Sequence, residues 1–139
     1  MAEIKISELS VGDWVQDKNG KYAQILGIEN WSDGYLLNVR INGVDIGCVP
    51  SLAAHPIPLT PEILEKNGWA EYSDVHNSWK LDIADNMRVW MFKNSHDWTF
   101  QVMNWGLGHN HCMAKAYITS IHQLQHALRL AGVEKEIVL

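Results

Sequence analysis

The sequence predicts an α+β protein in two parts, a small curled β-barrel in residues 1–57 and an antiparallel β-meander with two helices in residues 58–139. Turn signals separate short stretches of strand-forming residues in the first part. The second part contains two stretches with helix start and stop signals, and its strand-type segments are joined by linkers too short for parallel crossovers. With 47% hydrophobic residues among 139, the chain can bury a core.

The first part is predicted to be all β. Asn19-Gly20, Asp33-Gly34 and Asn42-Gly43 are turn-forming pairs. Residues 22–28 and 37–41 alternate apolar and polar side chains, which is typical of strands with one buried face. Five short strands in fewer than 60 residues favour a small barrel.

The run LSVGDWV, from Leu9 to Val15, resembles the first turn and strand of SH3-like barrels. The resemblance implies an SH3-like barrel for residues 1–57. Trp31 and Tyr35 flank the Asp33-Gly34 turn, where SH3-like barrels present ligand-binding loops, so we predict a binding site there. In the alternative interpretation, both rings only cover the end of the barrel.

Two helices are predicted, over residues 60–67 and 120–131. Thr60 caps the first helix, and Gly68 stops it in a Schellman motif. Ser120 and Gln123 form a predicted capping box for the second helix, which Gly132 ends.

Residues 57–69 (IPLTPEILEKNGW) and 117–132 (YITSIHQLQHALRLAG) resemble a family of small uncharacterised proteins coded by gut bacteria and their prophages. The resemblance implies an accessory role on a mobile element. It assigns no functional residue.

Four histidines are candidate metal ligands: His109, His111, His122 and His126. On a helical wheel, the last two fall opposite the apolar arc that should pack on the sheet, so we predict that the four do not share a metal. No HExxH, GxSxG or phosphate-binding glycine loop is present, and no cofactor is expected. A small metal-dependent hydrolase using these histidines remains the rival function.

Cys48 and Cys112 lack CxxC spacing, so we expect two reduced, buried thiols. The alternative pairs Cys112 with His109 or His111 as a nucleophile. The N-terminus lacks a secretory signal, and no apolar run approaches the roughly 18 residues that span a bilayer. A cytoplasmic location without membrane contact is therefore expected.

Seven tryptophans are many for this length, and the VWMF run from Val89 to Phe92 predicts a sheet that is apolar on both faces. We favour a sheet covered by a helix and by the barrel; alternatively, one face is a docking surface. The formal net charge is −5 and neither part is basic, which disfavours a nucleic-acid-binding accessory. The resulting prediction is a non-enzymatic binding or adaptor protein whose partner is another protein.

Overall fold

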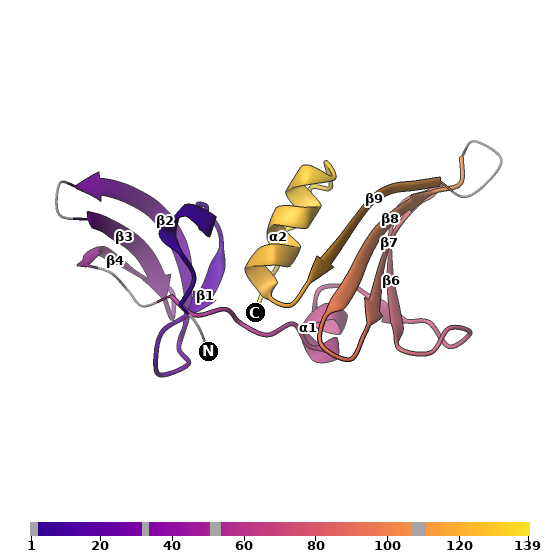
Figure 1. The fold of residues 1–139 in the computed structure, drawn as a ribbon, viewed down its shortest axis with the longest axis horizontal. Helices are drawn as coiled ribbons and strands as arrows, with labels where there is room; N and C mark the ends of the chain where they lie inside the picture. The colour runs from indigo at the N-terminus through magenta and orange to yellow at the C-terminus, as the bar shows by residue number, and fades with distance from the viewer. Residues whose placement is uncertain (1–2, 32–33, 51–53, 107–110) are drawn as a thin grey trace. The chain divides into compact units, whose positions relative to one another are not determined.

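A computed structural model describes residues 3–31, 34–50, 54–106 and 111–139 of the chain, except for the side chains of residue 31 and of residues 48–50. The chain divides into two compact units, Met1–Pro58 and Leu59–Leu139. Each unit contains one antiparallel sheet, and the second unit also contains two α-helices (Figure 1). The α+β class is therefore confirmed.

The N-terminal unit begins with a short 3-10 helix and continues as a four-stranded meander in the order β1-β2-β3-β4. Its elements are η1 (Ile6–Glu8), β1 (Trp14–Gln16), β2 (Tyr22–Trp31), β3 (Gly34–Ile41) and β4 (Val44–Pro50). Alternate side chains of the strands form the core with Leu9 and Ala54. Asn42 and Gly43 both have positive φ, 52° and 77°, so the predicted turn between β3 and β4 is confirmed.

The N-terminal sheet is open, and the closed barrel predicted for residues 1–57 is not observed in the described part of the unit. After β4 the chain returns to β1 with a single bridge, in which Gln16 and His55 exchange backbone hydrogen bonds of 3.0 and 2.8 Å. The next residues include Pro56 and Pro58, which have no N–H to donate. A fifth strand therefore cannot extend along β1 and close the sheet.

The C-terminal unit is a five-stranded antiparallel meander in the order β5-β6-β7-β8-β9. The strands are β5 (Ala70–Glu71), β6 (Ser78–Ala84), β7 (Met87–Lys93), β8 (Trp98–Asn104) and β9 (His111–Ile118). The predicted meander is confirmed, with the two-residue β5 added beside β6.

The two predicted helices are present as α1 (Pro61–Lys66) and α2 (Ile121–Leu130). Thr60 Oγ1 accepts a hydrogen bond from the Ile63 N–H at 3.3 Å, which confirms the predicted cap. The Schellman bonds are also present: the Trp69 N–H donates to the Leu64 carbonyl at 3.0 Å, and the Val133 N–H to the Leu128 carbonyl at 2.8 Å.

The predicted capping box of α2 is not formed. Gln123 Oε1 accepts from the Thr119 N–H at 2.8 Å, one residue before the expected donor. The Ser120 hydroxyl lies 3.0 Å from Nδ1 of His122 and makes no cap bond to the helix. A nearby imidazole therefore replaces the backbone N–H as the partner of this hydroxyl.

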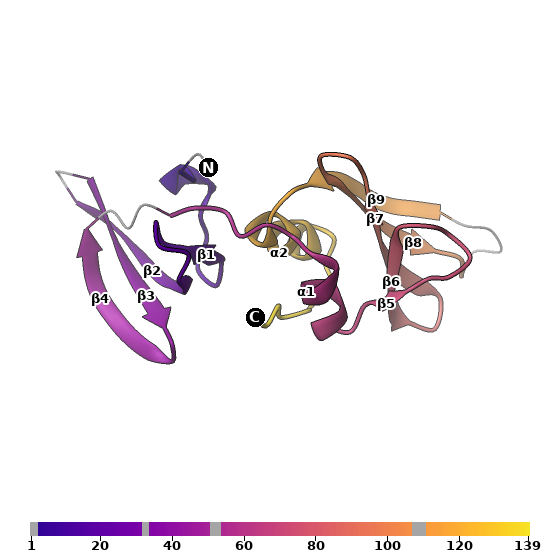
Figure 2. The ribbon, with the colours of Figure 1, turned by 90° about the horizontal axis from the view of Figure 1, so that it is seen from below.

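Both helices lie on the same side of the β6–β9 sheet (Figures 1 and 2). The strand residues facing them form the core of the unit, and Trp79 Nε1 donates to Glu65 of α1 at 3.2 Å. The members of this inner face that are buried are Trp79, Val89, Met91, Trp98, Phe100, Val102 and Ile118. We call the opposite face, carried by the alternate residues of the same strands, the outer face.

Candidate functional site

The outer face carries a column of stacked side chains along β7. Arg88, Trp90 and Phe92 are two residues apart, so strand geometry places them in a row on one face. The rings of Trp90 and Phe92 are 5.6 Å apart at 16°, and Arg88 Cζ lies 5.3 Å from the centre of the Trp90 ring. Tyr72 and Trp105 join from the segments after β5 and β8. We call these five residues the aromatic column.

Contacts with neighbouring segments hold the column in place. Tyr72 packs edge-on against Trp90 with ring centres 5.2 Å apart. The ring of Trp105 lies 5.0 Å from Arg88 Cζ, and its backbone N–H donates to the carbonyl of Asn86 at 3.0 Å. The turn between β6 and β7 therefore fixes the ring that closes one end of the column.

Arg88 is the charged member of the column, and its side chain retains only 21% of its exposure. Nε donates to Oδ1 of Asp82 on β6 at 2.6 Å. Within the described part of the chain, the two Nη groups make no hydrogen bond. Arg88 also lines a shallow depression of about 270 Å³, together with Trp90, Met103 and Trp105.

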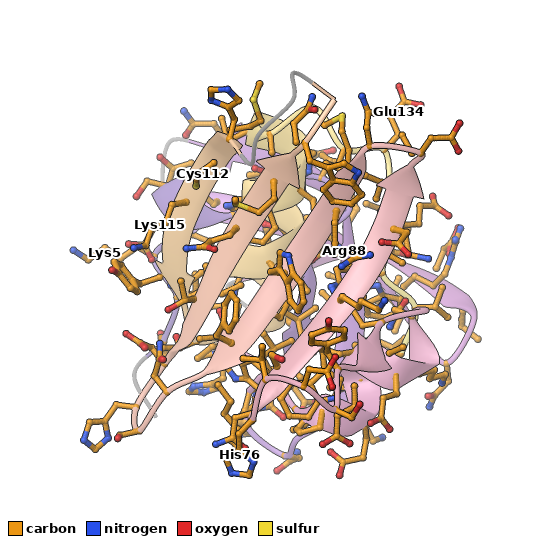
Figure 3. The ribbon with its side chains drawn as sticks, turned by 90° about the vertical axis from the view of Figure 1, so that its right-hand side faces the viewer. Lys5, His76, Arg88, Cys112, Lys115 and Glu134 are labelled. Atoms are coloured by element: carbon orange, nitrogen blue, oxygen red, sulfur yellow. The ribbon has the colours of Figure 1, made fainter. Side chains whose placement is uncertain are left out.

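Other cations surround the column. Lys80 Nζ lies 5.2 Å from the ring of Tyr72, and Lys115 Nζ lies 5.5 Å from the ring of Tyr117. Figure 3 views this face and labels Arg88 on β7 and Lys115 on β9. These three cations face two nearby carboxylates among the described residues, Asp82 on β6 and Asp74, which is bonded to Tyr72. The face is therefore locally positive although the chain carries a formal net charge of −5.

Tyr72 is kept in its neutral form. A hydrogen bond with the Asp74 carboxylate, together with the negative charge of that group, raises the pKa of the Tyr72 phenol. The ring remains an uncharged partner for Lys80.

The binding site predicted at Trp31 and Tyr35 is described only in part. Trp31 pairs with Gly34 across the β2–β3 hairpin, but its side chain and the turn residue Asp33 lie outside the described residues. Tyr35 is 45% exposed and so is available for contact.

The four candidate histidines do not assemble into a described metal site. His109 lies outside the described residues, and His111 lies on β9. His122 is only 5% exposed and contacts the Ser120 hydroxyl, while the rings of His122 and His126 are 5.8 Å apart. In the parts of the chain that are described, no three His, Cys, Asp or Glu residues are placed to hold a metal ion.

The helical wheel predicts that His122 points away from the sheet, on a surface of the helix, but this residue is buried. A helical wheel assumes that a helix packs against one flat surface and buries only its apolar residues. The residues of α2 that are buried include the polar His122: they are Ile121, His122, Leu124 and Leu128. Gln123, Arg129 and Leu130 are exposed. The buried arc is therefore wider than the apolar residues alone indicate. The contact with the hydroxyl of Ser120 helps to offset the cost of burying this imidazole.

Cys112 is exposed, so the prediction of a buried thiol is wrong for this residue. It lies on the edge strand β9 beside a register shift, opposite Met103, and Sγ contacts the Ala114 carbonyl at 3.4 Å. The side chain of Cys48 lies outside the described residues.

Comparison of the chain with protein-family models, with curated proteins and with solved structures found no match. Fold and surface chemistry therefore carry the functional argument: they define an α+β protein of two antiparallel sheets with an aromatic, cationic face on the second. Among the described residues, no helix is long and apolar enough to cross a bilayer.

Proposed function

We propose that this chain is a non-enzymatic binding or adaptor protein and that its partner, another protein, docks on the outer face of the C-terminal sheet. The aromatic column carries this proposal, because half-exposed Trp, Tyr and Arg side chains dominate the energetics of protein interfaces. Tyr117 on β9, with 64% of its surface exposed, extends the same face.

A nucleic-acid partner fits this face less well. Single strands bind when bases stack on open ring faces. Arg88 and Phe92 lie two residues before and two after Trp90, so they occupy its two sides and the ring presents its edge outward. A base could stack on Trp90 only by displacing one of these neighbours.

A metal-dependent hydrolase has less support than a binding protein. Of its four candidate ligands, His122 is buried against Ser120, and His111 is on the edge strand of the sheet. Neither residue belongs to a described cluster that could hold a metal ion.

The proposal keeps the expected cytoplasmic location, and it places the protein in a mobile-element context because of the resemblance of residues 57–69 and 117–132. It also treats the N-terminal sheet as an incomplete relative of SH3-like barrels. The LSVGDWV run before β1 and the return of His55 to β1 support that relationship.

Photo-crosslinking tests the docking surface. A benzophenone amino acid is placed at position 117 on the outer face or, as a matched tyrosine control, at position 35 on the N-terminal sheet. The proteins are irradiated in the cells that express them. We expect one reproducible protein adduct from position 117, absent in Trp90→Ala and absent from position 35. An adduct from position 35 alone would move the docking site to the turn beside Trp31.

A further inference from the structure

We infer that Arg88 is the anchor of the docking surface and that it binds a carboxylate side chain in an acidic segment of the partner. The inference rests on the proposed function and names the chemistry that the outer face recognises. It follows from three features: the orientation of the guanidinium group, the hydrogen bonds still open to it, and the charges around it.

The guanidinium group is held in place before any partner arrives. Its Cζ lies 5.3 Å from the Trp90 ring and 5.0 Å from the Trp105 ring, and Nε is bonded to Asp82 at 2.6 Å. An arginine normally loses conformational entropy when it binds. Stacking and the Asp82 bond have already removed most of that freedom, so less is lost on association.

The bonding capacity left to Arg88 matches one carboxylate group. A guanidinium group has five N–H donors, and two parallel N–H bonds to the two oxygens of a carboxylate form its strongest pairing. Asp82 occupies Nε, while Nη1 and Nη2 make no hydrogen bond within the described residues, and Arg88 is one of the residues that line the depression. A carboxylate can therefore bind end-on across the two Nη groups.

Arg40 on the N-terminal sheet already binds a carboxylate of its own chain. Its Nε and Nη2 bind the two oxygens of Asp45 at 2.7 and 3.3 Å, so the fork is already used by a carboxylate of the same chain. No ring contact of Arg40 is seen among the described residues. The residue is a matched control for Arg88.

The charge around the depression favours an acidic segment. Lys80 on β6 lies across from Trp90 on β7. Lys115 lies on β9, two strands away from Arg88, and pairs with Gln101 on β8. These positions extend the positive charge across the face to either side of Arg88, so several carboxylates of one segment can be attracted together. The Trp90 ring has Phe92 stacked on it and Arg88 against its other side, so it offers bases no open face, which favours a protein segment over a nucleic acid.

The test is an NMR titration of the full, ¹⁵N-labelled chain with two probes of the same length, capped hexaglutamate and capped hexaglutamine. Binding is followed by the chemical shifts of the Arg88 Nε–H and of the indole N–H groups of Trp90 and Trp105. We expect saturable shifts with hexaglutamate and none with hexaglutamine. Arg88→Lys should weaken hexaglutamate binding about ten-fold, because one point charge replaces the fork, and Arg40→Lys less than about two-fold.

Asp82→Asn is a second variant with the opposite expected sign. The amide oxygen can still accept from Nε, while the removal of one negative charge should strengthen hexaglutamate binding about two-fold or more. A misfolded variant cannot produce tighter binding, so this result separates recognition from loss of structure.

Two results would overturn the inference. Absence of hexaglutamate shifts at Arg88 and Trp105 would remove the anchor, while the crosslinking at position 117 could still support the docking face. Tighter binding of hexathymidylate or inorganic phosphate than of hexaglutamate at these signals would assign the site to phosphate rather than to an acidic protein segment.

Discussion

The two sheets of this protein share an antiparallel meander topology and differ in what they carry on the face opposite the core. On the N-terminal sheet, Asn38 of the middle strand lies against two glycines: a Cβ at Gly27 would be 3.2 Å from its Nδ2, and a Cβ at Gly47 would be 3.5 Å from its Oδ1. On the C-terminal sheet, the corresponding alternate positions hold the aromatic column.

The two faces differ in whether their polar groups find partners within the chain. Asn38 fills the space over the glycines, and Arg40 binds both oxygens of Asp45 through Nε and Nη2. The column instead leaves half-exposed rings and two open Nη groups. Interfaces combine apolar surface with polar groups that a partner can bind, so this difference favours the second sheet as the proposed docking surface.

The largest expected effect comes from two phenylalanines on opposite faces of the C-terminal sheet. Phe100 on the inner face is 1% exposed, whereas Phe92 stacks on Trp90 in the column. Phe100→Ala should lower the free energy of unfolding by about 3 to 5 kcal/mol, because it leaves a cavity in the core. Phe92→Ala should cost about 1 kcal/mol and should mainly reduce partner binding.

Urea denaturation of the two variants measures this contrast. Equal losses would mean that the outer face is part of the core of the unit, and the assignment of that face to docking would then fail. Leu130→Ala, which truncates an exposed residue of α2, is the control and should change stability by less than about 0.5 kcal/mol.

The parts of this fold that the sequence predicts correctly depend on neighbouring residues. Thr60, Gly68 and Gly132 act on the backbone within a few positions, and Asn42-Gly43 sets its own turn. Closure of the N-terminal sheet would require the segment after β4 to pair along β1, which lies about 40 residues earlier in the chain. No local sequence pattern encodes that pairing.

The sequence predicts a possible docking face on this sheet but not the arrangement of its side chains, because that arrangement also depends on distant residues. The VWMF run indicates two apolar faces, but the stacking of Arg88 between Trp90 and Trp105 requires the β7–β8 register and the tie between Trp105 and Asn86. A charged residue two positions before Trp90 on a predicted strand was the one available signal. It places a cation beside the ring without showing that the Nη groups stay open.

A second, smaller effect is expected from two histidines, one in each unit. His122 contacts the Ser120 hydroxyl, and both residues are buried. In the N-terminal unit, Nδ1 of His55 is buried and has no hydrogen-bond partner in the described residues. His122→Leu should cost about 1 to 3 kcal/mol, because it leaves a buried hydroxyl unpaired.

His55→Leu should be neutral or slightly stabilising, because an apolar side chain removes an unsatisfied nitrogen. Thermal unfolding of both variants in the same buffer checks the pair. A large loss in His55→Leu would show that its ring has a partner beyond the described residues.

The smallest expected effect is a change in pH dependence confined to the N-terminal sheet. Asp17 Oδ1 accepts from the Lys21 backbone N–H at 2.9 Å and from the Asn19 N–H at 2.8 Å. These bonds, that of Lys21 first, lower the pKa of the Asp17 carboxyl below its ordinary value. A carboxyl whose pKa is lower in the folded than in the unfolded chain binds its proton more readily when unfolded.

The resulting stabilisation is complete above the unfolded pKa of about 4 and is lost as the pH falls through the lower, folded pKa. Asp17→Asn keeps an oxygen that can accept both N–H bonds but removes the titration. We therefore expect this variant to differ little from wild type at pH 3 and to be less stable at pH 6, by less than the loss expected for His122→Leu. Amide hydrogen exchange at Lys21, referred to the amides of β7 in the same sample, measures the difference. A pH slope unchanged by the substitution would show that these two bonds do not distinguish the charged carboxylate from the neutral amide, and the turn would then be held by its backbone bonds alone.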